Sequence, residues 1–167
     1  MRLFIALSLS EAQRKAVLSI QDAFRAAGVR GNFTPKENLH LTLVFIGEYP
    51  DPDAVLSAMA EAPFQPVKLA LQGVGAFGDL WWIGLRENPT LAGYVRNLRR
   101  ALAEGGIPFD RKRFSPHITL VRRAVPGERG FPGVQVPAIE ATIDHVCLMR
   151  SERGRNGMIY TEVGRVP

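Results

Sequence analysis

Two stretches of the chain alternate apolar and polar residues with the period of a β-strand, and both carry the same tetrad. One stretch holds His40-Leu41-Thr42-Leu43 and the other holds His117-Ile118-Thr119-Leu120. Successive strand side chains point to opposite faces, so each histidine shares a face with the threonine two residues later. The aliphatic residues of each tetrad then fill a core on the opposite face. The pattern therefore predicts two strands that each present an imidazole and a hydroxyl on one side.

The surroundings of the tetrads also repeat, with an offset of 77 residues (117 minus 40). This offset overlays the strand-like run Leu3–Leu9 on Leu80–Arg86, and a helical pattern follows each run. The order strand, helix, loop and tetrad strand thus occurs twice, in units of approximately residues 2–77 and 79–154. We expect a single two-lobed α+β domain over residues 1–167, a pseudo-twofold duplication with two antiparallel sheets flanked by helices. The two histidine faces then look at each other across a cleft between the sheets.

The remaining patterns predict the other elements of the domain. Ser10 and Gln13 form a capping box at the start of a helix, and Gly28 is placed to end that helix. Asn88 and Pro89 begin a second long helix, with proline at its allowed first position. We expect strands at Arg2–Leu9, Leu39–Ile46, Val67–Leu71, Leu80–Leu85, Ala141–Met149 and Met158–Val163, a short helix within Asp51–Ala62, and loops at Arg30–Asn38, Gln72–Asp79 and Val125–Pro137.

The segment Gly73-Val74-Gly75-Ala76-Phe77-Gly78 matches the G-x-G-x-x-G pattern of dinucleotide-binding sites. That fingerprint must follow a strand and open a helix, whereas Leu80-Trp81-Trp82-Ile83 opens a strand. We therefore interpret the glycines as a flexible loop between antiparallel strands and reject a dinucleotide site. Phe77, Trp81 and Trp82 are able to stack on a base, although aromatic residues in strands more commonly belong to the core.

Composition and charge are those of a soluble globular chain with an anionic partner. No apolar run approaches the roughly 20 residues of a membrane span. The net charge is +5, and residues 84–167 hold 14 basic and 8 acidic side chains against 7 and 8 in residues 1–83. Such a one-sided basic surface favours RNA, although a merely solvated arginine-rich surface would have the same composition. The N-terminal apolar run is too short for a signal peptide and the single Cys147 allows no internal disulfide, so we expect a cytoplasmic location.

The paired tetrads are suited to proton transfer at a phosphate. A single strand histidine is usually structural, but two copies in matching contexts indicate a shared function. An imidazole has an ordinary pKa of about 6.5, so it can give or take a proton near neutral pH. Two imidazoles on opposite sides of a phosphorus atom support in-line displacement, while Thr42 and Thr119 donate hydroxyls to its non-bridging oxygens. This chemistry requires no metal and no cofactor. His145 has no metal-ligand spacing around it, so we interpret it as a structural or surface residue instead of a zinc ligand.

Further residues around the tetrads match a known superfamily. They are Arg2-Leu3-Phe4-Ile5-Ala6, Asn38-Leu39-His40-Leu41-Thr42-Leu43 with Gly47, Phe114-Ser115-Pro116-His117-Ile118-Thr119-Leu120 with Arg122, and Arg150-Ser151-Glu152 with Gly157 and Tyr160. On these residues the chain resembles the two-histidine phosphoesterases, and among them the RNA 2′,3′-cyclic phosphodiesterases, historically called 2′-5′ RNA ligases. The resemblance covers nearly the whole chain. The tetrads are specific to the superfamily, and the flanking residues select the family less sharply.

The resemblance implies metal-independent hydrolysis of RNA 2′,3′-cyclic phosphate ends to 2′-phosphate ends. It adds reversible 2′-5′ RNA ligation as an accompanying reaction, tRNA fragments as candidate substrates and a monomeric state. It also implies that His40 is the proton donor, that His117 is the proton acceptor and that Arg122 binds phosphate. The residues alone do not assign the two proton roles, because the two halves are nearly symmetric.

The position of Arg122 in the second tetrad strand does not fit a phosphate-binding role if side chains alternate strictly. Strict alternation puts Arg122 on the face opposite His117, so the strand must end or bulge there, or the side chain must reach round. Phe45 occupies the equivalent place in the first half, so we expect any arginine contribution to be one-sided.

Two other functions fit parts of the sequence. The same chemistry would serve a small cyclic nucleotide or an ADP-ribose cyclic phosphate, which needs only a charged pocket instead of a long basic surface. A non-catalytic RNA-binding module would explain the basic and aromatic residues, but it leaves the paired tetrads without a role.

Overall fold

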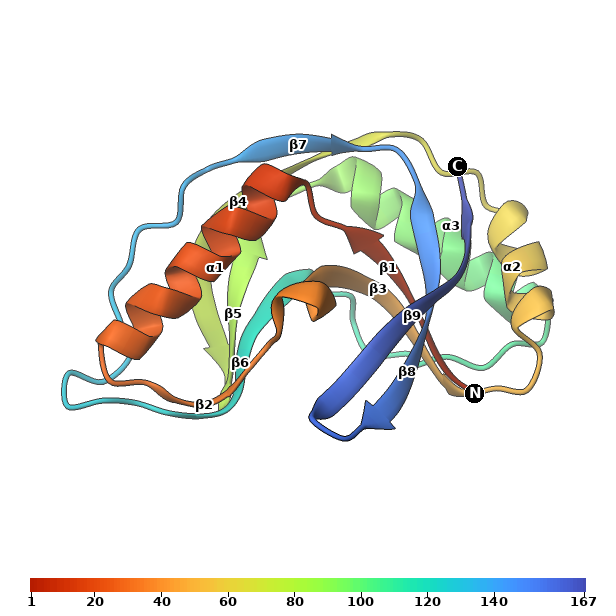
Figure 1. The fold of residues 1–167 in the computed structure, drawn as a ribbon. Helices are drawn as coiled ribbons and strands as arrows, with labels where there is room; N and C mark the ends of the chain where they lie inside the picture. Colours follow the sequence, from red (N-terminus) through yellow and green to blue (C-terminus); the bar gives the residue numbers. More distant parts are fainter.

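The computed structural model describes residues 1–167 as two antiparallel β-sheets with three α-helices, which confirms the predicted α+β class (Figure 1). The helices are α1 (Glu11–Ala26), α2 (Pro52–Ala60) and α3 (Pro89–Glu104), and a 3-10 turn, η1, spans Lys36–Asn38. One sheet has the strand order β3 (His40–Glu48), β1 (Arg2–Ser8), β8 (Val146–Gly154) and β9 (Gly157–Val166). The other has the order β2 (Arg30–Phe33), β6 (His117–Val125), β5 (Leu80–Leu85), β4 (Val67–Phe77) and β7 (Glu140–Ile143).

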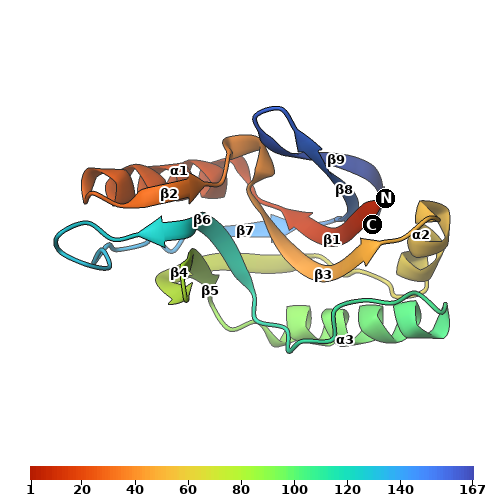
Figure 2. The ribbon, with the colours of Figure 1, turned by 90° about the horizontal axis from the view of Figure 1, so that it is seen from below.

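Two hydrophobic cores lie beneath the helices, so the molecule has two lobes (Figure 2). The core under α2 and α3 also takes in Val67 and Leu69 of β4 and Ile143 of β7. Helix α1 buries Val17, Ile20 and Phe24 against the five-stranded sheet. Helices α2 and α3 bury side chains that include Met59 and Leu98 against the four-stranded sheet. Because the helices cover one face of each sheet, the other faces remain open to form a site.

The lobes are built by exchange between the two halves of the sequence. The 77-residue offset overlays β1 on β5, α1 on α3, β3 on β6 and β4 on β8. Yet β4 of the first half pairs with β5 of the second, and β8 of the second half pairs with β1 of the first. The long helices are exchanged as well, because α1 packs on the sheet of β6 and α3 packs on the sheet of β3. Each lobe therefore contains elements from both halves.

The ends of the long helices follow the predicted local chemistry. The Gln13 N–H donates to the Ser10 hydroxyl, and the Ser10 N–H donates to the Gln13 side chain, so the capping box is formed. Asn88 caps α3 by accepting a hydrogen bond from the Leu91 N–H at 3.0 Å. Gly28 has a φ of +87°, the left-handed conformation that ends α1 and that glycine adopts without strain.

Two predicted loops are wrong, because both segments contain strands. Arg30–Asn38 contains β2 and η1, and β2 is a short edge strand with three of its four residues exposed, so no apolar periodicity reveals it. Gly73 to Phe77 belong to β4, and the turn shrinks to Gly78 and Asp79. A side chain at Gly75 would place its Cβ 2.3 Å from the Trp82 ring, so this glycine makes room for an indole instead of a turn.

The predicted strand Ala141–Met149 is also wrong, since it is two strands in different sheets. β7 pairs with β4 in one sheet, and β8 pairs with β1 in the other. The chain changes sheet at Asp144 and His145, whose side chains hydrogen bond to each other at 2.9 Å. A continuous apolar pattern cannot reveal this break, because both strands bury their apolar residues.

A β-bulge interrupts the first tetrad strand. In β3, Thr42 pairs with Ala6 and Val44 pairs with Ile5, so Leu43 is an extra residue without a partner. Both Leu43 and Val44 are buried, which strict alternation would not allow.

The second tetrad strand has the same irregularity at the equivalent place. In β6, Thr119 pairs with Trp82 and Val121 pairs with Trp81, which leaves Leu120 as the extra residue. An extra residue reverses the parity of the side chains that follow it. Arg122 therefore shares the face of His117 and Thr119. Of the three possibilities that the sequence left open for Arg122, the structure has the bulge.

A side chain of helix α1 hydrogen bonds to the bulge in β6. The Leu120 carbonyl accepts hydrogen bonds from the Gln21 amide at 3.0 Å and from the Thr34 N–H at 2.9 Å. The same Gln21 amide donates to the Thr34 carbonyl at 2.9 Å. Gln21 is 1% exposed and its bond to the Leu120 carbonyl is buried, so water has no access there as a substitute donor.

We expect Gln21→Leu to lower the free energy of unfolding by about 1–3 kcal/mol, because the buried Leu120 carbonyl loses one of its two donors and the Thr34 carbonyl loses the Gln21 amide. Urea unfolding followed by circular dichroism measures the change. Lys15→Ala, at an exposed position of the same helix, is the control and should change stability by less than about 0.5 kcal/mol. A Gln21→Leu variant as stable as the parent protein would show that the bulge does not depend on this amide.

Candidate active site

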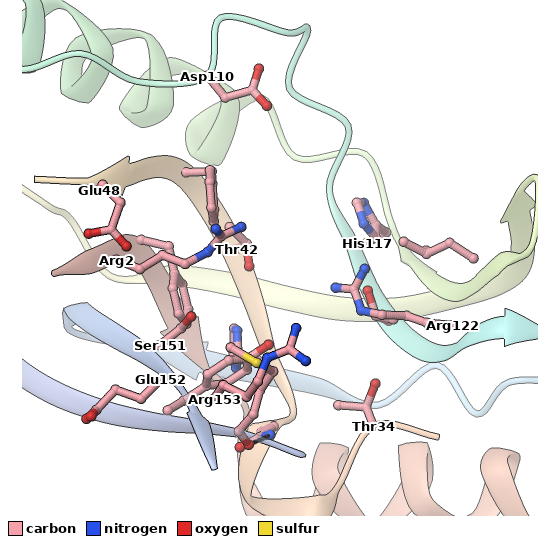
Figure 3. Close-up of a pocket in the computed structure, with 18 of the residues that line it drawn as sticks. Arg2, Thr34, Thr42, Glu48, Asp110, His117, Arg122, Ser151, Glu152 and Arg153 are labelled. Carbon is pink, nitrogen blue, oxygen red and sulfur yellow. Dashed lines mark hydrogen bonds between the residues drawn. The ribbon is translucent and has the colours of Figure 1, made fainter. Parts of the chain in front are cut away.

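A cavity of about 1080 Å³ lies between the two sheets and receives side chains from both (Figure 3). All five residues predicted from the sequence line it, namely His40, Thr42, His117, Thr119 and Arg122. Figure 3 shows His117 and Arg122 on the β6 side, with Thr42 across the cavity on β3. The two tetrads thus face one space, although they belong to different sheets and different halves of the chain.

His40 is enclosed by aromatic rings at the first position of β3. Its ring stacks on Phe4 with 5.0 Å between ring centroids and 23° between planes. Tyr160 of β9 meets the same imidazole edge-on at 5.1 Å. Phe4 is itself 4% exposed, so this side of His40 is closed to water.

Burial determines the charge state of His40 in the free protein. Loss of water around the ring lowers the pKa of His40 to about 4, well below its ordinary value. A hydrogen bond with the Asn38 backbone opposes this change, and the positive charges of Arg14 and Arg122 add to it. His40 is therefore a neutral imidazole at pH 7 before any substrate binds.

His117 has a more open setting at the first position of β6. Its Nδ1 lies 2.7 Å from the Ser115 carbonyl oxygen, so the neutral ring carries its proton on Nδ1 and leaves Nε2 for a substrate. The edge of Phe77 lies 5.1 Å away, measured between ring centroids, and Trp82 lies at 6.3 Å. The two tetrad histidines thus share a strand position but not an environment.

Each side of the cavity contributes a guanidinium. Arg122 lines it from β6, as the parity of the bulge requires. Arg2, at the exposed start of β1, also lines it and lies over the Phe45 ring at 5.0 Å. A guanidinium thus lines the cavity from both sides, although the tetrad strands alone offer one only on the side of β6. No pattern within the tetrads points to Arg2, because it comes from a different strand and only pairing brings β1 beside β3.

The hairpin of β8 and β9 forms one wall of the cavity, through residues that include Ser151, Arg153 and Met158. Asn38, two residues before His40, donates its side-chain amide to the Met158 carbonyl at 2.9 Å. Asn38 is 6% exposed, so this bond fixes the hairpin to the turn that leads into β3. Sequence reasoning gave Asn38 no role, because a polar residue before a strand is an ordinary loop residue.

Other parts of the molecule hold no comparable set of reactive groups. His145 lies outside the cavity and bonds to its neighbour Asp144. No three histidine, cysteine, aspartate or glutamate side chains gather in a group that would hold a metal ion. None of the three helices is both long enough and apolar enough to cross a membrane.

Known proteins are similar to this chain in both sequence and fold. The RNA 2′,3′-cyclic phosphodiesterase of Thermus thermophilus is 34% identical, over an alignment that covers 96% of this chain and 87% of that protein. The protein of the same name from Thermotoga maritima is 29% identical, with 96% and 91% covered. The crystal structure of Escherichia coli LigT complexed with 3′-AMP has a TM-score of 0.85 and 26% identity, with 99% and 96% covered.

The family match extends over most of the chain, since residues 11–155 fit the 2′-5′ RNA ligase superfamily. This range includes both tetrads, Arg122, the exchanged helices α1 and α3, and strands β4 and β8. The resemblance inferred from the sequence is confirmed, and the chain belongs to the 2′-5′ RNA ligase superfamily.

Proposed function

We propose that this chain hydrolyses RNA 2′,3′-cyclic phosphate ends to 2′-phosphate ends, with the tetrad histidines as proton donor and acceptor. The observation that supports this most directly is the cavity in which His40, Thr42, His117 and Thr119 face one space. The relatives named RNA 2′,3′-cyclic phosphodiesterase support the same substrate class.

The reaction needs two proton transfers around one phosphorus atom. Water attacks phosphorus opposite the 3′ oxygen, the bond between phosphorus and that oxygen breaks, and the phosphate stays on the 2′ oxygen. One imidazole takes a proton from the attacking water, and the other gives a proton to the departing 3′ oxygen. His40 and His117 start strands in different sheets, so one imidazole is available on each side of a bound phosphate.

We assign His40 as the donor and His117 as the acceptor from the resemblance. Because the pKa of His40 is about 4 in the free protein, this assignment requires His40 to take up its proton in the substrate complex. The bound phosphodiester supplies a reason, since a negative charge beside an imidazole favours its protonated form.

The remaining cavity residues can stabilise the charge that builds up on the phosphate. Thr42 and Thr119 lie on the faces of their histidines and can donate hydroxyls to the two non-bridging oxygens. Arg122 and Arg2 add a positive charge from each side. These groups supply acid, base and charge stabilisation together, so we propose a mechanism without a metal ion.

The same site chemistry accommodates ligation. If the 5′-hydroxyl of a second RNA takes the place of water, attack on the cyclic phosphate gives a 2′-5′ linkage with the same two proton transfers. We propose this as a second reaction of the site, in competition with hydrolysis.

A basic loop beside the cavity favours RNA over a small cyclic nucleotide or an ADP-ribose cyclic phosphate. Lys112 lines the cavity, and Arg99 of α3 donates to its carbonyl at 2.8 Å. Arg99 and Arg111 both lie over the Phe109 ring, at 5.7 and 4.7 Å. Comparing turnover of a cyclic-phosphate oligonucleotide, a cyclic mononucleotide and ADP-ribose cyclic phosphate tests this preference. Absence of turnover with RNA binding intact would favour a non-catalytic RNA-binding module.

We expect His40→Ala and His117→Ala each to lower kcat by roughly 10²–10⁴-fold, because each removes one proton transfer. The double variant should lose less than the product of the single losses, since the two residues act as a unit. Thr42→Ala and Thr119→Ala should be milder, and His145→Ala should match the parent protein. Turnover of a 2′,3′-cyclic phosphate by correctly folded variants measures these effects. Near-full activity of either single histidine variant would exclude paired acid–base catalysis.

Activity should survive excess EDTA unchanged, because the proposed mechanism assigns every step to side chains. The measurement is the initial rate on a cyclic mononucleotide after dialysis against chelator, with and without added zinc or manganese. A rate that falls with chelator and returns with metal would contradict the metal-free mechanism.

The pH dependence of kcat/KM should have an acid limb near pH 4, the pKa of His40 in the free protein. The proposed reaction needs a single proton on the two histidines together. Protonation of His40 before substrate binds adds a second proton to the pair, so no neutral imidazole is left to take a proton from water and the rate falls. Tyr160→Ala should move the limb upward, because water then reaches His40 and its pKa returns toward about 6.5. A limb at the same pH in both proteins would show that Tyr160 does not shield His40.

A further inference from the structure

An exposed aromatic residue lies directly beside His117 and has no part in the proposed proton transfers. Phe77, the last residue of β4, is 47% exposed, and its ring meets His117 edge-on at 5.1 Å with 88° between planes. Its other neighbour is Trp82, with 5.2 Å between ring centroids. An accessible aromatic ring beside one of the tetrad histidines is placed where a group bound at that histidine could contact it.

The strand register places these aromatic rings on the face of the sheet that carries the second tetrad. Phe77 pairs with Leu80, which lines the cavity. Trp82 pairs with Thr119 across the β5–β6 boundary. Paired residues of antiparallel strands share a face, so Phe77 and Trp82 continue the floor of the site outward from His117.

Two glycines let the indole of Trp82 lie flat across the sheet. A Cβ at Gly75 would lie 2.3 Å from the Trp82 ring, and a Cβ at Gly84 would lie 3.2 Å from it. Gly84 is also the residue that pairs with His117. The glycines on β4 and on β5, the strand of Trp82 itself, thus leave space for the Trp82 ring where side chains would otherwise stand.

Phe4 beside His40 is buried, whereas Phe77 beside His117 is exposed. His40 also has two aromatic neighbours, but Phe4 is 4% exposed and is fully used as packing. Phe77, in contrast, is 47% exposed and remains accessible to a ligand. A planar ring that is open on one face is the element on which proteins stack nucleobases, whatever their sequence.

We propose that Phe77, supported by Trp82, is a stacking platform for a nucleobase of the RNA substrate and positions the cyclic phosphate against His117. This proposal rests on the proposed function, since it names where the RNA lies in that same site. The base concerned belongs either to the terminal nucleotide, which carries the cyclic phosphate, or to its neighbour in the chain.

The test compares substrates with and without bases. Turnover is measured with a cyclic-phosphate oligonucleotide, a cyclic mononucleotide and methyl riboside 2′,3′-cyclic phosphate, which has no base. Phe77→Ala should lower the ratio of kcat/KM for the oligonucleotide to that for the base-free compound by roughly 10- to 100-fold. Phe77→Tyr should keep the ratio, and Phe77→Leu should lose it, because only the tyrosine ring can stack. A loss with the mononucleotide assigns the platform to the terminal base, and a loss only with the oligonucleotide assigns it to the neighbouring base.

Phe131 provides a matched control. It is 41% exposed, but it packs on Phe24 and Trp81, the core of the opposite face. Phe131→Ala should leave all three substrates at the level of the parent protein. If Phe77→Ala slows the base-free compound as much as the oligonucleotide, Phe77 acts on His117 and the platform is excluded. If the parent protein turns over none of the substrates, the proposed function itself fails.

Discussion

The bulges at Leu43 and Leu120 break the alternation of β3 and β6, and the composition of the cavity depends on that break. Without the extra residue, Arg122 would point into the core of its lobe and the site would lose a cation. The same irregularity in β3 places Phe45 at the cavity, where the guanidinium of Arg2 lies over its ring. A bulge is costly unless its unpaired groups are satisfied, and Gln21 of α1 supplies that need in β6. The helix thus contributes to the site without entering it.

The two tetrad histidines differ in their surroundings although the tetrads match. The two histidines occupy equivalent strand positions, yet one is enclosed by Phe4 and Tyr160 while the other faces an open aromatic surface. Enclosure lowers the pKa of His40, because the charged imidazole loses its hydration. A duplicated fold can in this way place two imidazoles in different environments from one repeated tetrad, without any change in the tetrad itself.

The sequence was most informative where local rules decide the outcome. Helix caps at Ser10 and Asn88 and the faces of the tetrad strands depend on neighbours within a few residues, and the structure has them as predicted. Predictions failed where pairing with a distant strand decides. Edge strand β2 and the change of sheet at Asp144 leave no local signal. Arg2 was missed for the same reason, since only the pairing of β1 with β3 brings it to the cavity.

The exchange of strands and helices between the halves has a consequence for how the protein can be made. β1 is synthesised long before β8, with which it pairs, so Arg2 finds its partner Ser151 only after most of the second half has been made. Contacts between residues so far apart in the chain slow folding, because a long loop must close before they form. A nascent chain that carries only the first tetrad has neither sheet complete, since each sheet needs strands from the second half. Catalytic competence should therefore appear in a single late step, and a truncated chain should keep no half-site that could capture RNA unproductively.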